Sequence, residues 1–85
     1  MKEYQVIVDK RVMKPFRRIP EKHARQIQEA MGRLRVNPHP HDSIKLKATG
    51  GYRLTVGEYR ILYTVEEEEL TVTIYLIAKR NDFNY

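Results

Sequence analysis

Three β-strands joined by two short turns are the strongest structural signal in the chain. Residues 52–56, 59–65 and 70–77 are rich in Val, Ile, Leu, Tyr and Thr, the residue types that favour strands. The first connection, at 57–58, has the two-residue length of a hairpin turn, and the second, at 66–69, consists of four glutamates. Strands with such short connections pair as antiparallel neighbours, so this region predicts a β-meander. We interpret the glutamates as solvating the turn.

The first half of the chain predicts one strand followed by two helices. Residues 3–9 alternate in polarity and favour a strand, and Asp9 can cap a helix over about 10–18. Pro15 keeps that helix short or bent because it lacks an N–H. A longer helix over about 20–36 begins with a proline at the first helical position, where proline is tolerated. Its apolar residues recur every three or four positions and are Ala24, Ile27, Met31 and Leu34.

The predicted order of elements is β-α-α-β-β-β, which indicates an α+β fold. We expect a single domain over residues 1–85, with the helices as a hairpin packed on one face of a small, mostly antiparallel sheet. The other face of the sheet would remain uncovered, and Arg60 would project from its centre. The apolar residues expected to face the helices form one stripe on each of the last two strands: Tyr59, Ile61, Tyr63 and Val65, then Leu70, Val72, Ile74 and Leu76.

Charge and composition favour an anionic partner and exclude several protein classes. Sixteen Lys and Arg against eleven Asp and Glu give a net charge of +5, although four of the acids are gathered at 66–69. The remaining surface is therefore basic enough to favour a polyanion or an acidic protein. No apolar run approaches the ~20 residues that span a bilayer, and the N-terminus lacks the pattern of a signal peptide, so we expect a cytoplasmic protein.

The sequence indicates no metal site and no cofactor. There are no cysteines, which excludes thiolate ligands. His39 and His41 are closely spaced, but no third ligand follows at a suitable spacing, and the alternating prolines around them predict an extended surface loop.

Basic side chains from separate strands are expected to converge on the uncovered face of the sheet. A guanidinium group presents paired donors that match phosphate oxygens. A phosphate held between two arginines is also poised for cleavage, because charge accumulates on its oxygens in the transition state. From the residues alone, ordinary solvated ion pairs explain these cations equally well. The candidate groups are Arg53, Arg60, Lys79, Arg80 and Tyr85, with Lys45 and Lys47 on the loop before the meander.

Three segments resemble the RelE/ParE toxin superfamily, and in particular its RelE-like branch. KLKATGGYRLTVGEYRILYTV at 45–65 and IAKRNDFNY at 77–85 match its strand pattern, and DKRVMKPFRRIPEKH at 9–23 is similar to its opening strand-to-helix segment. The most specific part is GEYRILY at 57–63. The resemblance covers nearly the whole chain, and the order and lengths of its elements agree with the fold predicted from the residues.

The resemblance implies a toxin of a type II toxin–antitoxin system. RelE-like members are endoribonucleases that cut mRNA in the decoding site of the 70S ribosome, and an acidic, RelB-like antitoxin neutralises them. The implied reaction is attack of a 2′-hydroxyl on the adjacent phosphorus, which leaves a 2′,3′-cyclic phosphate and a 5′-hydroxyl. No metal, small-molecule cofactor or membrane is implied.

Roles carry over to individual residues by this resemblance. Arg60 matches the strand arginine that binds the scissile phosphate, and Arg80 matches the arginine assigned to transition-state charge and the leaving group. Arg53 matches a basic residue that is a lysine in the best-studied relatives. Tyr85 resembles the C-terminal tyrosine that stacks on a base or orients the nucleophile, and Phe83 is a competing aromatic. The residues expected to bind RNA or the ribosome are Lys45, Lys47, Lys79 and Phe83.

Two departures from the pattern bear on activity. Thr55 stands where those relatives carry a second lysine, and all three histidines precede the meander, so no acid–base pair that titrates near neutral pH is visible. We therefore expect poor cleavage of free RNA and dependence on the ribosome to align the nucleotides. Two alternatives remain open: a non-enzymatic, ParE-like toxin that acts on DNA gyrase, and a degenerate RNA-binding module.

Overall fold

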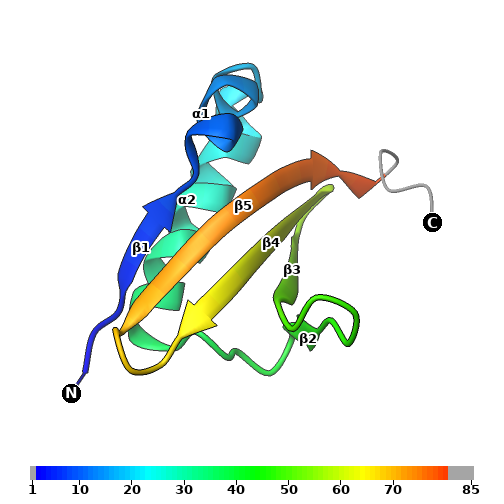
Figure 1. Cartoon of the computed structure of the whole chain (residues 1–85). Coiled ribbons are helices and arrows are strands. Elements are labelled where there is room, and N and C mark those ends of the chain that lie inside the picture. Colours follow the sequence, from blue (N-terminus) through cyan, green and yellow to red (C-terminus); the bar gives the residue numbers. More distant parts are fainter. Residues whose placement is uncertain (1, 81–85) are drawn as a thin grey trace.

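Two helices cover one face of a five-stranded sheet in the computed structural model, which describes residues 2–80 (Figure 1). The α+β fold predicted from the sequence is confirmed. No helix in the described part of the chain is long and apolar enough to cross a membrane. The elements are β1 (Gln5–Val8), α1 (Lys10–Arg17), α2 (Glu21–Val36), β2 (Ile44–Lys45), β3 (Tyr52–Val56), β4 (Tyr59–Glu66) and β5 (Thr71–Lys79).

The strands are ordered β1-β5-β4-β3-β2 in the sheet. Strands β3, β4 and β5 form the predicted antiparallel meander, while β1 pairs in parallel with β5 because the two helices carry the chain back to that edge. The two-residue strand β2 was not predicted. It lies in the segment before β3 that was expected to be a loop, and its Ile44 pairs with Arg53 of β3. Two residues are too few to show the alternation of polarity by which a strand is recognised.

The helix boundaries follow the local sequence closely. The Asp9 carboxylate accepts a hydrogen bond from the backbone N–H of Arg11 at 2.9 Å, which confirms the predicted N-cap of α1. Pro15 lies inside α1, which ends after eight residues. The sequence predicted Pro20 as the first helical residue of α2, but Pro20 is the N-cap and the helix begins at Glu21. The helix ends at Val36, as predicted.

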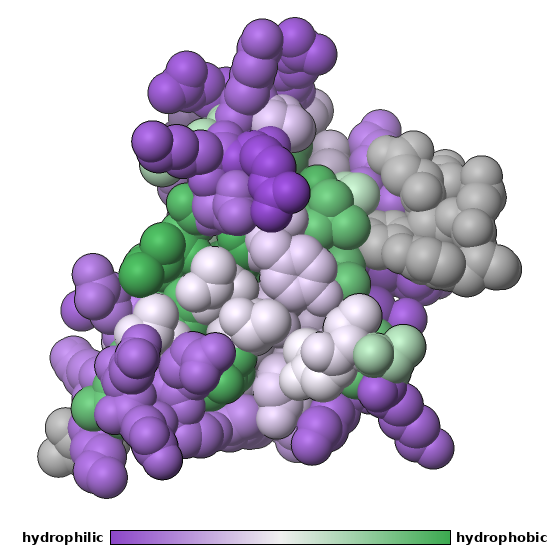
Figure 2. All heavy atoms as spheres, viewed as in Figure 1, coloured by the Kyte–Doolittle hydropathy of each residue, from purple (hydrophilic) through white to green (hydrophobic). Residues whose placement is uncertain are grey.

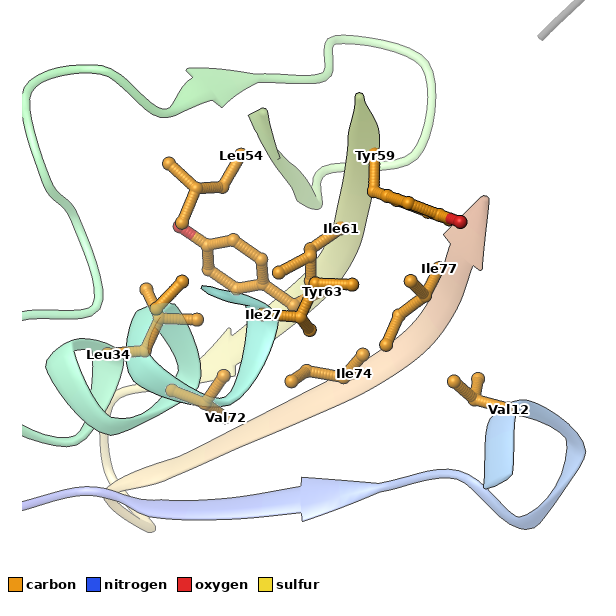
Figure 3. Packing of buried hydrophobic residues seen from close by; sticks show 11 residues of the cluster. Val12, Ile27, Leu34, Leu54, Tyr59, Ile61, Tyr63, Val72, Ile74 and Ile77 are labelled. Carbon is orange, nitrogen blue, oxygen red and sulfur yellow. The ribbon is translucent and has the colours of Figure 1, made fainter. Parts of the chain in front are cut away.

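The core lies between α2 and the helix-facing side of the sheet (Figure 3). Ile27, Ala30 and Leu34 of α2 are completely buried, as is Tyr63 at the centre of β4. The Tyr63 hydroxyl donates a hydrogen bond to the carbonyl of Pro38 at 2.9 Å and so fixes the loop after α2 to the sheet, and burial raises the pKa of this hydroxyl. The strand residues buried here are Leu54, Tyr59, Ile61, Tyr63, Val72, Ile74 and Ile77.

A β-bulge at Tyr75 breaks the alternation of β5. Leu62 pairs with Leu76, but the next residue, Tyr63, pairs with Ile74, so Tyr75 is an extra residue between the two pairs. Ile77 is therefore in the core at 7% exposure, whereas Leu76 is 39% exposed on the opposite face. The prediction that Leu76 faces the helices is wrong for this reason.

The prediction for Leu70 and the expectation of a bare outer face also need correction. Leu70 belongs to the turn before β5, where it has a positive φ of 50°. On the outer face, Leu46, Ala48 and Thr49 line a pocket together with Leu62, Tyr75 and Leu76. Leu62 is only 7% exposed. The chain between β2 and β3 thus covers part of the face that was expected to be open.

Candidate functional site

The ends of β4 and β5 bring Arg60 and Arg80 into one pocket. Arg60 is the second residue of β4 and pairs with Ala78, and Arg80 follows two residues later. Because side chains alternate along a strand, Arg80 continues on the face that carries Arg60 and Ala78. The pocket has a volume of about 320 Å³, and the residues that line it are Glu58, Arg60, Lys79 and Arg80. We call it the Arg60–Arg80 pocket.

The bulge at Tyr75 decides this convergence. Val72 and Ile74 face the helices, and strict alternation would have placed Ala78 and Arg80 on that same side. The extra residue reverses the parity of everything after it, so the end of β5 turns its even-numbered side chains toward the face of Arg60. The sequence pattern predicted the meeting of the two arginines but contained no sign of the bulge that produces it.

A tight turn holds one wall of the pocket against α2. Gly57 has a φ of 59°, a value that L-residues other than glycine rarely adopt, and a Cβ there would lie 3.0 Å from Gln26 Oε1. The next residue, Glu58, accepts a hydrogen bond through its carbonyl from the backbone N–H of Arg80 at 2.9 Å. Its carboxylate lies 3.5 Å from His23 Nε2 on α2. The end of β5, the turn and the first turn of α2 are therefore held together.

The pocket carries an excess of positive charge. Three cations and one carboxylate line it, and the carboxylate of Glu58 also faces His23. Lys79 and Arg80 are exposed, and neither forms an ion pair within residues 2–80, whereas Arg60 is half-buried. Such a site suits a phosphate group, because its oxygens accept several charge-assisted hydrogen bonds at once.

Arg53 lies beside the Arg60–Arg80 pocket but not in it. It pairs with Leu62 and faces the outer side of the sheet, where it borders a largely apolar groove of about 490 Å³. Its Nε atom is buried and has no hydrogen-bond partner in the described part of the chain. Thr55, two residues after Arg53 on β3, is the residue that pairs with Arg60 on β4. The groove is lined by Leu46, Ala48, Thr49, Arg53, Leu62, Tyr75 and Leu76.

The other predicted site residues lie farther away or outside the described chain. Lys45 and Lys47 are exposed at the β2 edge of the sheet, two strands away from β4, so they do not line the pocket. Lys79 does line it, as expected from its position next to Arg80. Phe83 and Tyr85 fall outside residues 2–80, so their expected roles stay predictions.

The glutamate turn has a structural role that the sequence did not reveal. Glu67 accepts a hydrogen bond from the Tyr4 hydroxyl, and its other carboxylate oxygen lies 2.5 Å from His39 Nε2. These two contacts, led by the one from Tyr4, lower the pKa of Glu67, and the same hydrogen bond raises the pKa of Tyr4. The cluster joins three segments that are distant in sequence. It lies at the end of β4 opposite Arg60, and residues 2–80 contain no group of side chains suited to a metal ion.

The outer face of the sheet is polar at its ends and weakly polar or apolar at its centre. Figure 2 shows hydrophilic side chains gathered above and below a central region of pale and green residues. Tyr75 and Leu76 occupy a ridge there, with the groove of Arg53 on one side and a second pocket, beside Arg11 and Pro15 of α1, on the other. An exposed apolar ridge of this kind is typical of a surface that binds another protein.

Comparison with known proteins identifies the family. The model of the family described as "ParE toxin of type II toxin-antitoxin system, parDE" matches residues 6–82. The chain belongs to this toxin family. A chain of the archaeal RelE–RelB complex from Pyrococcus horikoshii OT3 is 31% identical, with a TM-score of 0.85, and the match covers 95% of this chain and 99% of that one. The RelE-like branch predicted from the sequence is therefore confirmed.

Two further solved structures are similar to this chain. A chain of the toxin–antitoxin complex RelBE2 from Mycobacterium tuberculosis is 25% identical, with a TM-score of 0.80 over 92% of this chain and 99% of that chain. The isolated RelE toxin of E. coli is 22% identical, with a TM-score of 0.78 over 89% of this chain and 83% of that chain, and it shares the fold.

Proposed function

We propose that this RelE-like toxin is a ribosome-dependent endoribonuclease that cleaves mRNA in the decoding site. The observation that carries the proposal is the shared pocket of Arg60 and Arg80, two guanidinium groups from separate strands on one face of the sheet. Membership of a toxin family and similarity to RelE structures support it. A ribosomal target also places the activity in the cytoplasm.

In the proposed reaction, the 2′-oxygen of one nucleotide attacks the adjacent phosphorus. The bond between phosphorus and the 5′-oxygen breaks, and the products are a 2′,3′-cyclic phosphate and a 5′-hydroxyl. Arg60, which the strand holds half-buried, binds the non-bridging oxygens, and Arg80 stabilises the charge that develops on the leaving oxygen. Arg53 supports the neighbouring part of the RNA from its groove, and Tyr85 is proposed to contact a base.

Within residues 2–80, the side chains that line the pocket are those of Glu58, Arg60, Lys79 and Arg80, and no histidine is among them. Arginine stays protonated, and Thr55 occupies the position beside Arg60 where a basic group could have acted. Alignment of the nucleotides by the ribosome must then supply much of the rate, and orientation can contribute about 7–11 kcal/mol. The toxin is thus expected to cleave free RNA poorly.

Programmed ribosomes provide the test. Purified toxin is added to ribosomes that hold a defined mRNA, and the RNA ends are mapped. We expect cuts in the decoding site, and we expect Arg60→Ala and Arg80→Ala each to reduce the rate by about 10²–10³-fold. Arg33→Ala, an exposed position on α2, serves as the matched control and should leave the rate unchanged. Equal cleavage by all four proteins would refute the proposal.

An acidic, RelB-like antitoxin is the proposed protein partner. One of the similar structures is described as a RelE–RelB complex and another as a toxin–antitoxin complex, RelBE2. In this chain the ridge of Tyr75 and Leu76 offers an apolar anchor on a basic molecule. Leu76→Asp should weaken co-purification with the product of a neighbouring acidic reading frame. Because Leu76 also lines the groove of Arg53, co-purification rather than cleavage is the readout for this variant. Undiminished co-purification would place the antitoxin elsewhere.

A second candidate follows from the description of the matching family. That description names ParE and parDE. The resemblance in sequence implies, for the ParE-like branch, a non-enzymatic toxin that acts on DNA gyrase. A supercoiling assay with purified gyrase separates the two candidates. Covalent gyrase–DNA complexes, together with uncut mRNA on ribosomes, would establish the ParE-like activity.

A further inference from the structure

The outer surface of α1 carries a row of cations opposite its buried side. Val12 is buried against the core and Phe16 is half-buried, and these two residues are four positions apart on one side of the helix. Lys10, Lys14 and Arg17 recur at spacings of four and three and are all exposed. With ~3.6 residues per turn, they lie together on the opposite side, in a row that extends for about 10 Å along the axis. We call this row the α1 stripe.

The charge of the α1 stripe is not balanced by nearby acids. Asp9 is paired with Arg11 at 3.2 Å, and Glu21 with Arg25 at 2.8 Å, so both carboxylates of this region already have partners. None of the stripe residues forms an ion pair within residues 2–80. Arg18, just after α1, and Lys22, in the first turn of α2, are two more exposed cations without acidic partners within residues 2–80.

The α1 stripe and the Arg60–Arg80 pocket lie at the same end of the molecule. His23, next to Lys22, contacts Glu58, which lines the pocket. The glutamate turn at 66–69 follows the far end of β4, so its four acids and the α1 stripe are at opposite ends of the fold (Figure 1). This separation orients the basic end toward a polyanion as the two approach.

We propose that the α1 stripe is a second contact surface for an RNA backbone, distinct from the pocket that holds the scissile phosphate. The choice of RNA rests on the proposed function. The choice of backbone rests on the chemistry of the stripe, which is a regular row of three cations with no aromatic residue in it. One exposed apolar side chain, that of Met13, borders the row. Protein partners are usually held by apolar and aromatic anchors, whereas phosphate backbones are held by charge alone.

The experiment measures salt dependence of binding to an RNA that cannot be cleaved. A 2′-O-methyl single strand of 20 nucleotides is titrated at several salt concentrations, in the absence of ribosomes. The test variant is Lys10→Gln/Lys14→Gln/Arg17→Gln. The matched control, Lys2→Gln/Arg33→Gln/Arg35→Gln, removes the same charge from positions outside α1 and its connection to α2. Circular dichroism confirms that both variants are folded.

Each lost backbone contact lowers the slope of log K against log[salt] by about 0.7 for a single strand. We therefore expect the slope to fall by about 2 in the test variant, with roughly 100-fold weaker binding at 0.1 M salt, and to change little in the control. Equal losses in both triple variants would overturn the inference, since only net charge would then matter. Binding of poly-glutamate that depends on the stripe, without an effect on RNA, would overturn it in favour of an acidic protein.

The outcome does not depend on catalysis. In an Arg60→Ala/Arg80→Ala background, the stripe substitutions should still lower the slope of log K against log[salt] by about 2, because the two surfaces use different residues. If ribosomes show no cleavage but the stripe effect persists, the proposed function fails and the RNA-binding surface stands. If cleavage occurs and the stripe variant binds RNA like its control, the inference alone fails.

Discussion

A single buried hydroxyl holds the loop after α2, and its removal should have a measurable cost. Tyr63 is completely buried, and its hydroxyl donates to the carbonyl of Pro38 at 2.9 Å. Tyr63→Phe keeps the ring and its stacking on Tyr52, with centroids 5.6 Å apart, but leaves the Pro38 carbonyl without this donor. A net hydrogen bond contributes about 0.5–1.5 kcal/mol, and an unsatisfied buried acceptor costs about 1–3 kcal/mol. We expect the free energy of unfolding to fall by about 1–2 kcal/mol.

Urea unfolding at neutral pH, followed by circular dichroism, measures this change. For a domain of this size, the expected loss corresponds to a decrease in Tm of about 4–16 °C. The matched control is Tyr52→Phe, because the Tyr52 hydroxyl makes no hydrogen bond within residues 2–80 and should change stability by less than about 0.5 kcal/mol. Equal urea midpoints for the two variants would refute the reasoning, as would a changed m-value, which would indicate an altered denatured state.

Three further perturbations test other parts of the fold. Gly57→Ala should lower the free energy of unfolding, measured in urea, by about 1–2 kcal/mol, because the φ of Gly57 is 59°. Gly32→Ala in α2, where the new Cβ meets open space, should raise it by about 0.5–1 kcal/mol. Changes of the same sign in the two variants would contradict this. Asp9→Ala removes the N-cap of α1 and should cost about 1 kcal/mol by the same assay, with unchanged stability as the contrary result. Glu67→Gln tests linkage to pH: the pKa of Glu67 is lowered in the folded state, so its contribution is complete above the ordinary value of 4.5 and is lost as pH falls through the folded value. The stability gap between the parent and Glu67→Gln should therefore narrow in urea unfolding between pH 6 and pH 3, and a constant gap would contradict this assignment.

The elements of this protein could be predicted because their signals are local. The alternation of β4, the apolar spacing of α2 and the cap at Asp9 depend on residues within a few positions of each other, and all three appear in the structure as expected. The candidate arginines were also recognisable, because a permanently charged group such as Arg60 in an otherwise apolar strand requires an outward-facing, polar setting, although the structure places it at the second residue of β4 and not at the centre of the sheet.

The contacts between distant segments could not be predicted in this way. Glu67 looked like one of four equivalent glutamates until folding placed Tyr4 and His39 beside it. Similarly, the apolar groove beside the cationic pocket is lined in part by Leu46, Ala48 and Thr49, which meet Leu62 only in the folded chain. Contacts between distant segments produce no periodic pattern of residues in either segment, so they cannot be recognised from local sequence.

Local sequence patterns were enough to locate both helices and every strand except β2, and to mark the residues that could bind a phosphate. Tertiary structure decided that Arg60 and Arg80 meet, through the bulge at Tyr75. At that point β1 has ended, the N–H of Asp9 donates to the carbonyl of Ile74 at 2.9 Å, and α1 packs against the strand beyond. The register of β5 thus depends on hydrogen bonds and burial supplied by residues more than sixty positions earlier, which local propensities do not encode.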